Sequence, residues 1–398
     1  MTDSTEAPRR LRPVGQDGLT EALAEALTGG DPVGPLPEQS VERGAVLEML
    51  RPDVGVTEAG AAAVVATSGS TGRPKGAVLS RSAIAASADA THTRLGGAGD
   101  WVLALPGHYV AGLMVLARTL LAGTTAHRVP GQLTGLPAAV SAMTGRRYIS
   151  LVPTQLLRAC ADDELSEALA ACDAVLLGGA AADPSLLSRA RERGIRVVTT
   201  YGMSETCGGC VYDGVPLAGV GVAVEPETQR ILLAGPTLFS GYRLRDDLTR
   251  AALRGPQLLT QDRGCWEDGR LSVLGRLDDV VISGGVNVDL GAVERAVADW
   301  PELGGSEVAV VGVPHPEWGT EVVAVTDGTG SELGLRHYLR QTLPAAAAPR
   351  RLVRVARLPR TSSGKIDRQQ LIAGLVGARA HEQEDGTDVS GPDERNSR

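Results

Sequence analysis

Residues 67–76 read Thr-Ser-Gly-Ser-Thr-Gly-Arg-Pro-Lys-Gly and follow the apolar run Ala-Ala-Ala-Val-Val-Ala at 61–66. The glycines allow the backbone to approach an anion closely and to adopt positive φ angles. Backbone N–H groups and the hydroxyls of the loop can then donate to phosphate oxygens, and Lys75 adds positive charge. A Walker A loop would need Gly-Lys followed by Ser or Thr, so the stretch predicts a nucleotide site of a different fold.

Strand-like and helical segments alternate beyond this loop. A helix is expected to begin near Arg81, and residues 112–123 read as a buried helix. Strands alternating with helices predict an α/β domain whose strands are largely parallel. Residues 1–58 are expected to form a short α-rich lead-in, because their apolar residues recur at helical spacing. The runs that read as strands are 100–106, 146–153, 171–180 and 195–203.

From residue 221 the pattern of the sequence changes to short strand-like runs separated by Gly and Pro residues. Beyond Gly-Arg-Leu-Asp-Asp at 275–279 the chain reads as a small α+β unit. We therefore expect a large N-terminal α/β domain over residues 1–277 and a small C-terminal domain over 278–377. The polar tail over 378–398 is expected to be disordered.

Composition excludes several classes of protein. The 398 residues carry a formal net charge of −8 with no basic stripe, which argues against a nucleic-acid binder. The sequence has no run of about 18 apolar residues, so no membrane span is expected. The first residues do not resemble a secretory signal. Five cysteines, an odd number in a long chain, suit a reducing cytoplasm better than a disulfide framework.

Further motifs occur in a fixed order along the chain: Tyr-Gly-Met-Ser-Glu-Thr at 201–206, Asp262, the 275–279 stretch, and Ser-Gly-Lys at 363–365. Together with the loop at 67–76 they resemble the adenylate-forming superfamily of acyl-CoA synthetases, peptide-synthetase adenylation domains and luciferases. The resemblance implies a large domain and a small domain joined by a hinge, and it implies ATP and Mg²⁺ as cofactors. The ATP- or AMP-binding residues that it implies are Thr67, Ser68, Gly69, Ser70, Thr71, Gly72, Lys75, Gly178, Gly179, Ala180, Tyr201, Gly202, Met203, Ser204, Asp262, Arg276 and Lys365.

Several of these residues suit their implied roles chemically. Tyr201 is an aromatic plate for stacking on adenine, and Glu205 is a hard carboxylate suited to Mg²⁺. Asp262 would accept the ribose hydroxyls, although this chain has Thr260-Gln261-Asp262 where the family usually has Thr-Gly-Asp. By the resemblance Lys365 is catalytic, because a lysine can neutralise charge between an attacking carboxylate and the α-phosphate.

In such enzymes the acid is first adenylated, and its acyl group is then transferred to coenzyme A, the co-substrate. The second step needs the thiol of coenzyme A at the place that the loop around Lys365 occupied in the first step. Members of the superfamily achieve this by rotating the C-terminal domain about a hinge, and Asp278 matches the hinge position. Gly284 and Gly285 would then line the tunnel for coenzyme A. The resemblance also implies that the chain can form a homo-oligomer.

Two segments resemble the o-succinylbenzoate–CoA ligases of menaquinone biosynthesis: Ser-Leu-Val-Pro-Thr-Gln-Leu at 150–156 and the His-containing segment at 105–113. The resemblance places His108 beside the acyl and thiol path, where it would be a further catalytic residue. o-Succinylbenzoate carries two carboxylates, and Arg118 and Arg158 are candidates to hold the one that is not activated.

Three alternatives stay open. The acid could be another acyl or aryl acid, or the acceptor could be a carrier-protein thiol. A nucleotide-binding protein without catalysis is disfavoured by Glu205 and Lys365. The Cys207-Gly208-Gly209-Cys210 stretch lacks the second pair of a zinc site and the context of a thioredoxin-like motif, so neither metal binding nor redox chemistry is expected there.

Overall fold

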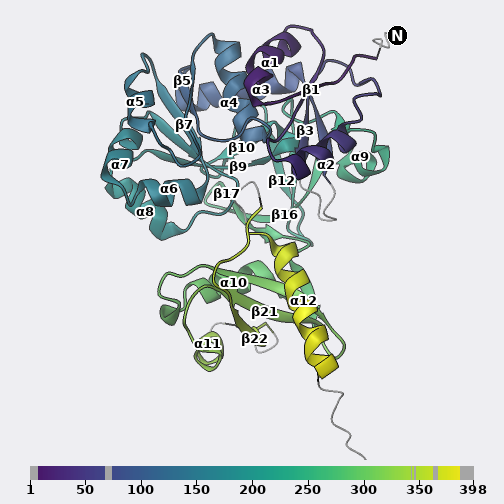
Figure 1. The fold of residues 1–398 in the computed structure, drawn as a ribbon, viewed down its shortest axis with the longest axis vertical. Coiled ribbons are helices and arrows are strands. Elements are labelled where there is room, and N and C mark those ends of the chain that lie inside the picture. The colour runs from purple at the N-terminus through teal and green to yellow at the C-terminus, as the bar shows by residue number, and fades with distance from the viewer. Residues whose placement is uncertain (1–7, 68–73, 342, 345–346, 362–365, 386–398) are drawn as a thin grey trace, which may run out of the picture. The chain divides into compact units, whose positions relative to one another are not determined.

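The structure divides into two compact units. In the N-terminal unit lie Met1–Thr260 and Gly264–Val273, and in the C-terminal unit Gln261–Arg263 and Leu274–Arg398 (Figure 1). The chain enters the C-terminal unit for the last time at Leu274, four residues before the start of the C-terminal domain expected from the sequence. The computed structural model describes residues 8–67, 74–341, 343–344, 347–361 and 366–385.

A seven-stranded sheet in the order β11-β10-β9-β8-β7-β5-β6 forms one half of the N-terminal unit. The strands from β9 to β6 are parallel, and β10 and β11 continue the sheet antiparallel. Its strands are β5 (Asp100–Leu103), β6 (Ala126–Arg128), β7 (Arg147–Leu151), β8 (Ala174–Leu177), β9 (Val197–Met203), β10 (Gly208–Tyr212) and β11 (Val215–Pro216).

Helices cover both faces of this sheet. Trp101 and Tyr148 belong to a core cluster with helix α4, whereas Val102 and Ile149 belong to a second cluster on the opposite face. This alternation follows from the two-residue repeat of a strand, and burial of both faces explains the continuous apolar runs. The covering helices are α3 (Arg81–Leu95) and α4 (Val110–Ala122) on one face, and α5 (Leu136–Ser141), α6 (Pro153–Ala159), α7 (Asp163–Ala170) and α8 (Pro184–Glu192) on the other.

A second sheet has the order β1-β2-β3-β4-β14. The expectation that residues 1–58 are purely α-rich is corrected by this sheet, because one strand precedes the first helix and another lies between the two helices. Each of these strands has only three residues, too few for a visible alternation, and their pairing depends on β3 as a tertiary partner. The elements are β1 (Arg12–Val14), α1 (Leu19–Leu27), β2 (Val33–Pro35), α2 (Ser40–Leu50), β3 (Ala61–Thr67), β4 (Lys75–Ser80) and β14 (Gly241–Tyr242).

The N-terminal unit ends in short antiparallel strands, as the Gly and Pro punctuation suggests. The order in this sheet is β12-β13-β16-β15, and β17 pairs with β16. The chain passes between the two units within β16 and β17. The elements are β12 (Gly221–Val224), β13 (Arg230–Ala234), α9 (Asp246–Ala252), β15 (Leu253–Arg254), β16 (Gln257–Glu267) and β17 (Arg270–Arg276).

The C-terminal unit is a small sheet with helices against it. Strands β20 and β21 form its central hairpin, and alternate residues of β20 enter two core clusters, one containing α10 and the other α12. Helix α12 runs to Asp385, so residues 378–385 are helical, which corrects the expectation of a disordered tail from residue 378. The elements are β18 (Val280–Ser283), β19 (Val286–Asp289), α10 (Leu290–Ala298), β20 (Val308–His315), β21 (Gly319–Thr326), α11 (Glu332–Leu339), β22 (Arg351–Arg354) and α12 (Arg368–Asp385).

The predicted architecture is confirmed: a large α/β unit with parallel-rich sheets precedes a small α+β unit. Among the described residues, no helix is both long and apolar enough to cross a membrane.

Candidate active site

The predicted site segments of the N-terminal unit meet at one edge of the seven-stranded sheet. Segment 104–109 follows β5, 152–156 follows β7, 178–180 follows β8, and 201–205 begins at the end of β9. These four strands are parallel neighbours, so their carboxyl ends lie along the same edge. In open α/β sheets, ligands bind in the crevice outside the carboxyl ends of the strands.

Direct contacts join these segments. The side-chain amide of Gln155 donates to the carbonyl oxygens of Ala104 (3.1 Å) and Gly131 (3.0 Å), and its own oxygen accepts from the N–H of Val152 (3.1 Å). The predicted o-succinylbenzoate segment at 150–156 therefore braces the loop that carries His108.

Glycines in the predicted adenine-binding segments are required by close approaches. A Cβ at Gly178 would lie 2.4 Å from Oγ1 of Thr200, and one at Gly202 would lie 2.1 Å from the carbonyl oxygen of Gly208. Gly179 has a φ of +84°, a conformation that favours glycine. Tyr201 is half-buried beside exposed Gly202. These glycines therefore allow neighbouring backbone segments to pack closely at this edge of the sheet.

Lys75, Glu205 and Tyr242 lie together at the start of β4. The phenol of Tyr242 donates a 2.6 Å hydrogen bond to Oε1 of Glu205, and Nζ of Lys75 lies 4.6 Å from the centre of the Tyr242 ring. Burial and the neighbouring Glu205 carboxylate raise the pKa of Tyr242 above its ordinary value. Tyr242 therefore stays a hydrogen-bond donor to the carboxylate at neutral pH.

Glu205 is well held by its backbone too. It lies in the 3₁₀ turn η2 (Ser204–Thr206), and its carbonyl oxygen accepts from the N–H of Phe239 at 2.9 Å. Glu205 as a whole residue is 8% exposed. Among the described residues, no group of three or more His, Cys, Asp or Glu side chains could hold a metal ion. A single carboxylate fits Mg²⁺, which usually binds one or two carboxylates together with substrate phosphates.

The turn after Glu205 explains the CxxC stretch. Thr206 Oγ1 accepts from the N–H of Met203 (2.9 Å) and donates to the carbonyl oxygen of Gly208 (2.6 Å), which closes the turn. Cys207 and Cys210 are buried free thiols. Burial raises the pKa of the Cys210 thiol to about 12 and that of Cys207 further still. Protonated, buried thiols are poor nucleophiles and poor metal ligands, so the pair packs in the core.

His108 lies two residues before α4 in a polar setting. Its Nδ1 lies 3.2 Å from the side-chain nitrogen of Gln16, its ring is tilted against Tyr109 with centroids 4.1 Å apart, and the Tyr109 hydroxyl donates to Glu42 (3.3 Å). Burial lowers the pKa of His108, which favours the neutral ring at pH 7. Nε2 of His108 is buried with no hydrogen-bond partner among the described residues.

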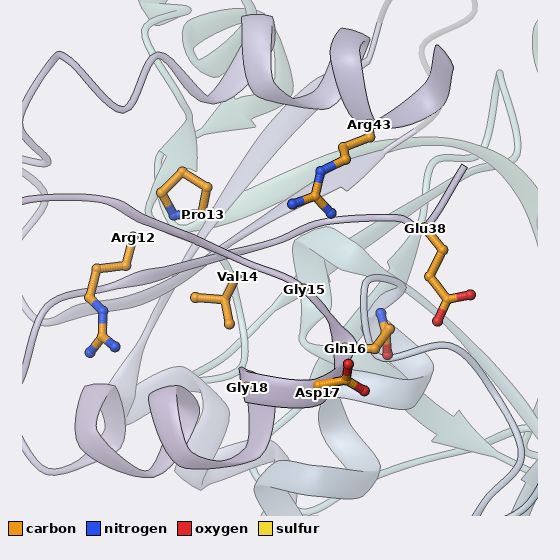
Figure 2. Close-up of a pocket in the computed structure, with 9 residues that line it drawn as sticks. All are labelled: Arg12, Pro13, Val14, Gly15, Gln16, Asp17, Gly18, Glu38 and Arg43. Atoms are coloured by element: carbon orange, nitrogen blue, oxygen red, sulfur yellow. The ribbon is translucent and has the colours of Figure 1, made fainter. Parts of the chain in front are cut away.

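A cavity of about 660 Å³ opens beside Gln16. Residues 12–18 line it together with Glu38 and Arg43, which come from the neighbouring segment (Figure 2). Because Gln16 also reaches His108, this N-terminal segment connects the cavity wall to the predicted acyl path.

The two arginines expected to hold a second carboxylate differ in setting. Arg158 is exposed on α6. Arg118 is 3% exposed, its guanidinium carbon lies 4.9 Å from the centre of the Trp101 ring, and its Nε has no partner among the described residues. Their roles remain predictions.

Three predicted residues of the C-terminal unit form one cluster. The guanidinium of Arg276 makes two hydrogen bonds to Asp278, of 2.7 and 2.8 Å, and lies 3.5 Å from Asp262. Gly284 (φ +56°) and Gly285 (φ +80°) form the tight turn between β18 and β19, as expected for a two-residue hairpin loop. The predicted ribose acid and the predicted hinge thus share one arginine.

The remaining predicted residues lie outside the part of the chain that the structure describes. They are Ser68, Gly69, Ser70, Thr71 and Gly72 of the phosphate loop, and Ser363, Gly364 and Lys365 near the C-terminus. The flanking Thr67 and Lys75 are partners across the β3–β4 pair, so the two ends of the phosphate loop are held side by side.

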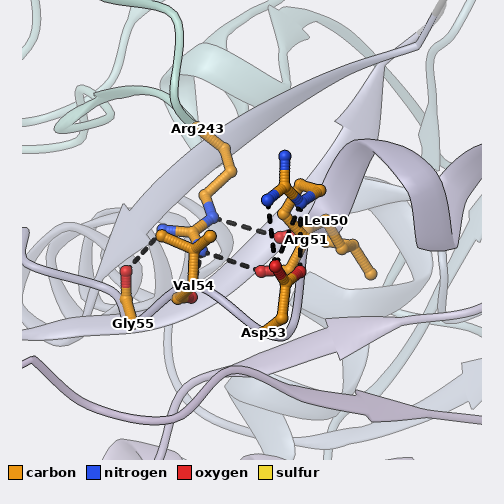
Figure 3. Close-up of polar contacts among 6 residues, drawn as sticks. All are labelled: Leu50, Arg51, Asp53, Val54, Gly55 and Arg243. Carbon is orange, nitrogen blue, oxygen red and sulfur yellow. Dashed lines mark hydrogen bonds and ion pairs between the residues drawn. The ribbon is translucent and has the colours of Figure 1, made fainter.

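Tyr242 and Arg243 were not predicted from the sequence. Arg243 is 3% exposed, and its guanidinium donates to the carbonyl oxygens of Leu50, Arg51, Val54 and Gly55 (Figure 3). Its own N–H donates to Gly76 at 2.7 Å, so it ties the strand after the phosphate loop to the end of α2. In the sequence these two residues stand in the run Gly-Tyr-Arg at 241–243. We did not recognise this run as a motif.

Comparisons with known proteins identify the family of this chain. The AMP-binding enzyme family matches residues 13–249, and the AMP-binding enzyme C-terminal domain matches residues 292–365. Over 377 residues the chain is 42% identical to a Mycobacterium tuberculosis protein named probable 2-succinylbenzoate–CoA ligase, and the match covers 90% of this chain and 95% of that one.

Solved structures show the same fold. The o-succinylbenzoate CoA synthetase of Bacillus subtilis, in complex with the acyl-adenylate intermediate OSB-AMP, has a TM-score of 0.70 and 25% identity, covering 88% of this chain and 80% of that chain. The ATP-bound MatB protein of Rhodopseudomonas palustris has a TM-score of 0.80 and 23% identity, covering 94% of this chain and 90% of that chain.

Proposed function

The chain belongs to the AMP-binding enzyme family, and from this premise we propose that it is an AMP-forming ligase that joins o-succinylbenzoate to coenzyme A. The observation that carries the substrate is the similarity, over nearly the whole of both chains, to the probable 2-succinylbenzoate–CoA ligase of Mycobacterium tuberculosis. The meeting of His108, Gly178 and Tyr201 segments at one sheet edge supports the same conclusion.

In the first step a carboxylate oxygen of the acid attacks the α-phosphorus of ATP. The new P–O bond gives the acyl-adenylate, and diphosphate leaves with the electron pair of the broken bond. Both reactants are anionic, so the site must offset their repulsion. Lys75 contributes positive charge from the N-terminal unit, and Lys365 is the proposed catalytic lysine. Glu205 would hold Mg²⁺, which would neutralise phosphate charge.

In the second step the sulfur of coenzyme A attacks the acyl carbonyl carbon. The thioester bond forms, AMP leaves, and the thiol proton passes to solvent or to a nearby base. The proposed hinge at Asp278 lets the C-terminal domain, taken as residues 278–377, exchange the lysine for the tunnel lined by Gly284 and Gly285. The turn geometry of these glycines suits a thin chain such as pantetheine.

We further propose that the enzyme works in the cytoplasm and forms a homo-oligomer. ATP and coenzyme A are cytoplasmic substrates, and five free cysteines persist in a reducing compartment. Sedimentation analysis of the purified protein measures the oligomeric state directly.

The function is tested by mass spectrometry of reactions with ATP, Mg²⁺, coenzyme A and one acid. We expect o-succinylbenzoyl-CoA and AMP to form far faster than the thioesters of benzoate or a medium-chain fatty acid. The Glu205→Gln variant, which keeps the shape and loses the charge, is the matched control and should form little product. Faster formation of a different thioester would replace o-succinylbenzoate as the assigned substrate. Absence of AMP with every acid would refute the proposed ligase activity.

A further inference from the structure

Gln16 contacts two neighbouring residues of the loop between β5 and α4. Its side-chain oxygen accepts a hydrogen bond from the backbone N–H of Gly107 at 3.0 Å, and its side-chain nitrogen lies 3.2 Å from Nδ1 of His108. A Cβ at Gly107 would lie 3.1 Å from that oxygen and 2.6 Å from Leu19. The glycine therefore makes room for the amide of a residue 91 positions earlier in the chain.

The orientation of the Gln16 amide follows from chemistry. A backbone N–H can only donate, so the atom facing Gly107 must be the oxygen of the amide. The other end is then the NH₂ group, which has no acceptor capacity. Nδ1 of His108 must accept from it, which places the single proton of the neutral ring on Nε2.

The nitrogen that carries this proton, Nε2 of His108, is buried. Nε2 of His108 has no hydrogen-bond partner among the described residues, and a buried donor left without an acceptor is costly. The charged groups that influence the ring are Glu42 on α2 and Glu38 just before it, and Tyr109 lies against the ring face. None of these is bonded to Nε2, so this N–H is available to donate to an oxygen of a bound molecule.

Resting on the function proposed above, we propose that Gln16 is a positioning residue that holds His108 as the neutral Nε2–H tautomer, so that Nε2–H donates a hydrogen bond to an oxygen of the acyl substrate. An imidazolium would place a second N–H at Nδ1 against the amide NH₂. The amide could relieve that clash only by turning over and losing its bond to Gly107. Gln16 therefore selects a donor that carries no charge.

The resting state is tested first, without any substrate. Nitrogen-15 NMR of the imidazole rings distinguishes the two neutral tautomers and the imidazolium, and the His108→Asn variant identifies the signal of His108. The wild-type protein should show the Nε2–H tautomer at pH 7. The Nδ1–H tautomer, or an imidazolium at pH 7, would overturn the proposal.

Two substitutions of Gln16 should act in opposite ways. Gln16→Met removes both hydrogen bonds at similar size, so both neutral tautomers should appear. Gln16→Glu accepts from Gly107 and from a protonated Nδ1, so it should raise the pKa of His108 and shift the signal towards imidazolium. Asp17→Asn, at the next and exposed position, is the matched control and should leave the spectrum unchanged.

Kinetics with substrate test the second half of the proposal. Gln16→Met should raise KM for the acid about twofold if the two tautomers become equally populated, because only the Nε2–H fraction can bind, and leave KM for ATP unchanged. Equal changes in both constants, or none, would show that His108 does not contact the acid. If the wild-type protein activates no acid at all, the proposed function fails, whereas the NMR result still decides whether Gln16 sets the tautomer.

Discussion

The phenolic oxygen of Tyr242 lies 2.6 Å from Oε1 of Glu205 and donates a hydrogen bond to it, although the two residues are 37 positions apart. Glu205 is the proposed ligand of Mg²⁺, and Tyr242 comes from the short strand β14, beside the strand that begins with Lys75. The bond fixes one oxygen of the carboxylate and leaves the other oxygen available to the proposed Mg²⁺.

Tyr242→Phe should therefore weaken the dependence on Mg²⁺ without unfolding the protein. Loss of a group that orients a metal ligand typically costs about 10–100-fold in metal affinity or activity. We expect the Mg²⁺ concentration for half-maximal adenylation to rise by about tenfold, measured by exchange of labelled diphosphate into ATP. Tyr338→Phe removes a hydrogen bond to Asp299 in the C-terminal unit and should leave that concentration unchanged. Equal Mg²⁺ curves for wild type and Tyr242→Phe would contradict this role.

Lys365→Ala should separate the two half-reactions. Because the lysine is proposed to act in adenylation, acyl-AMP formation should fall by about 10²–10³-fold, as for loss of a group that stabilises developing charge. Thioester formation from supplied acyl-adenylate and coenzyme A should stay largely intact. The chain has only two lysines, Lys75 and Lys365, so the variant retains a lysine in the phosphate loop alone. Loss of both half-reactions would refute the assignment.

Asp278→Pro should affect the opposite half-reaction. Proline fixes φ, so a hinge at this position would be arrested while adenylation continues. Asp278→Ala is the control, because it also removes the ion pair with Arg276 but keeps the backbone free. Separate assays of acyl-AMP and thioester formation should show that only the proline variant is impaired in the second step. Comparable loss of both steps would count against a hinge there.

Arg243→Met should destabilise the N-terminal unit. The substitution leaves the carbonyl oxygens of Leu50, Arg51, Val54 and Gly55 without their donor. We expect a loss of about 2–4 kcal/mol and a fall of roughly 5–10 °C in the thermal midpoint. Arg245→Met, which breaks only an exposed ion pair with Asp247, should leave the midpoint unchanged. A calorimetric scan in which both variants match the wild type would exclude the proposed role of Arg243.

The elements that sequence predicts well here are those with strong local patterns. The helix after Arg81 begins at that residue, and the buried helix at 112–123 corresponds to α4. The apolar run before the phosphate loop and the run at 195–203 form strands, as expected. In each case the apolar pattern of a few successive residues is sufficient.

The contacts that were not predicted join residues far apart in the chain. Gln16 and His108 are 92 positions apart, and Arg243 reaches carbonyls 188 to 193 positions earlier. Each of these side chains is polar and reads locally as a surface residue. Their roles depend on which loops the fold brings together, and no periodicity in one sequence encodes that. The resemblance could supply the ordered motifs but not these supporting partners.

The dependence of the 51–55 turn on Arg243 also bears on how the protein is made. During synthesis the first strands and the phosphate loop emerge long before β14, which pairs with the outer edge of β4. At about 5–20 residues per second, the ribosome needs roughly 10 to 40 s to add the intervening residues. Through that interval the nascent chain carries an unpaired strand edge and an unanchored turn, the situation in which chaperones bind. The proposed nucleotide site is completed late in translation, although its first half is translated early.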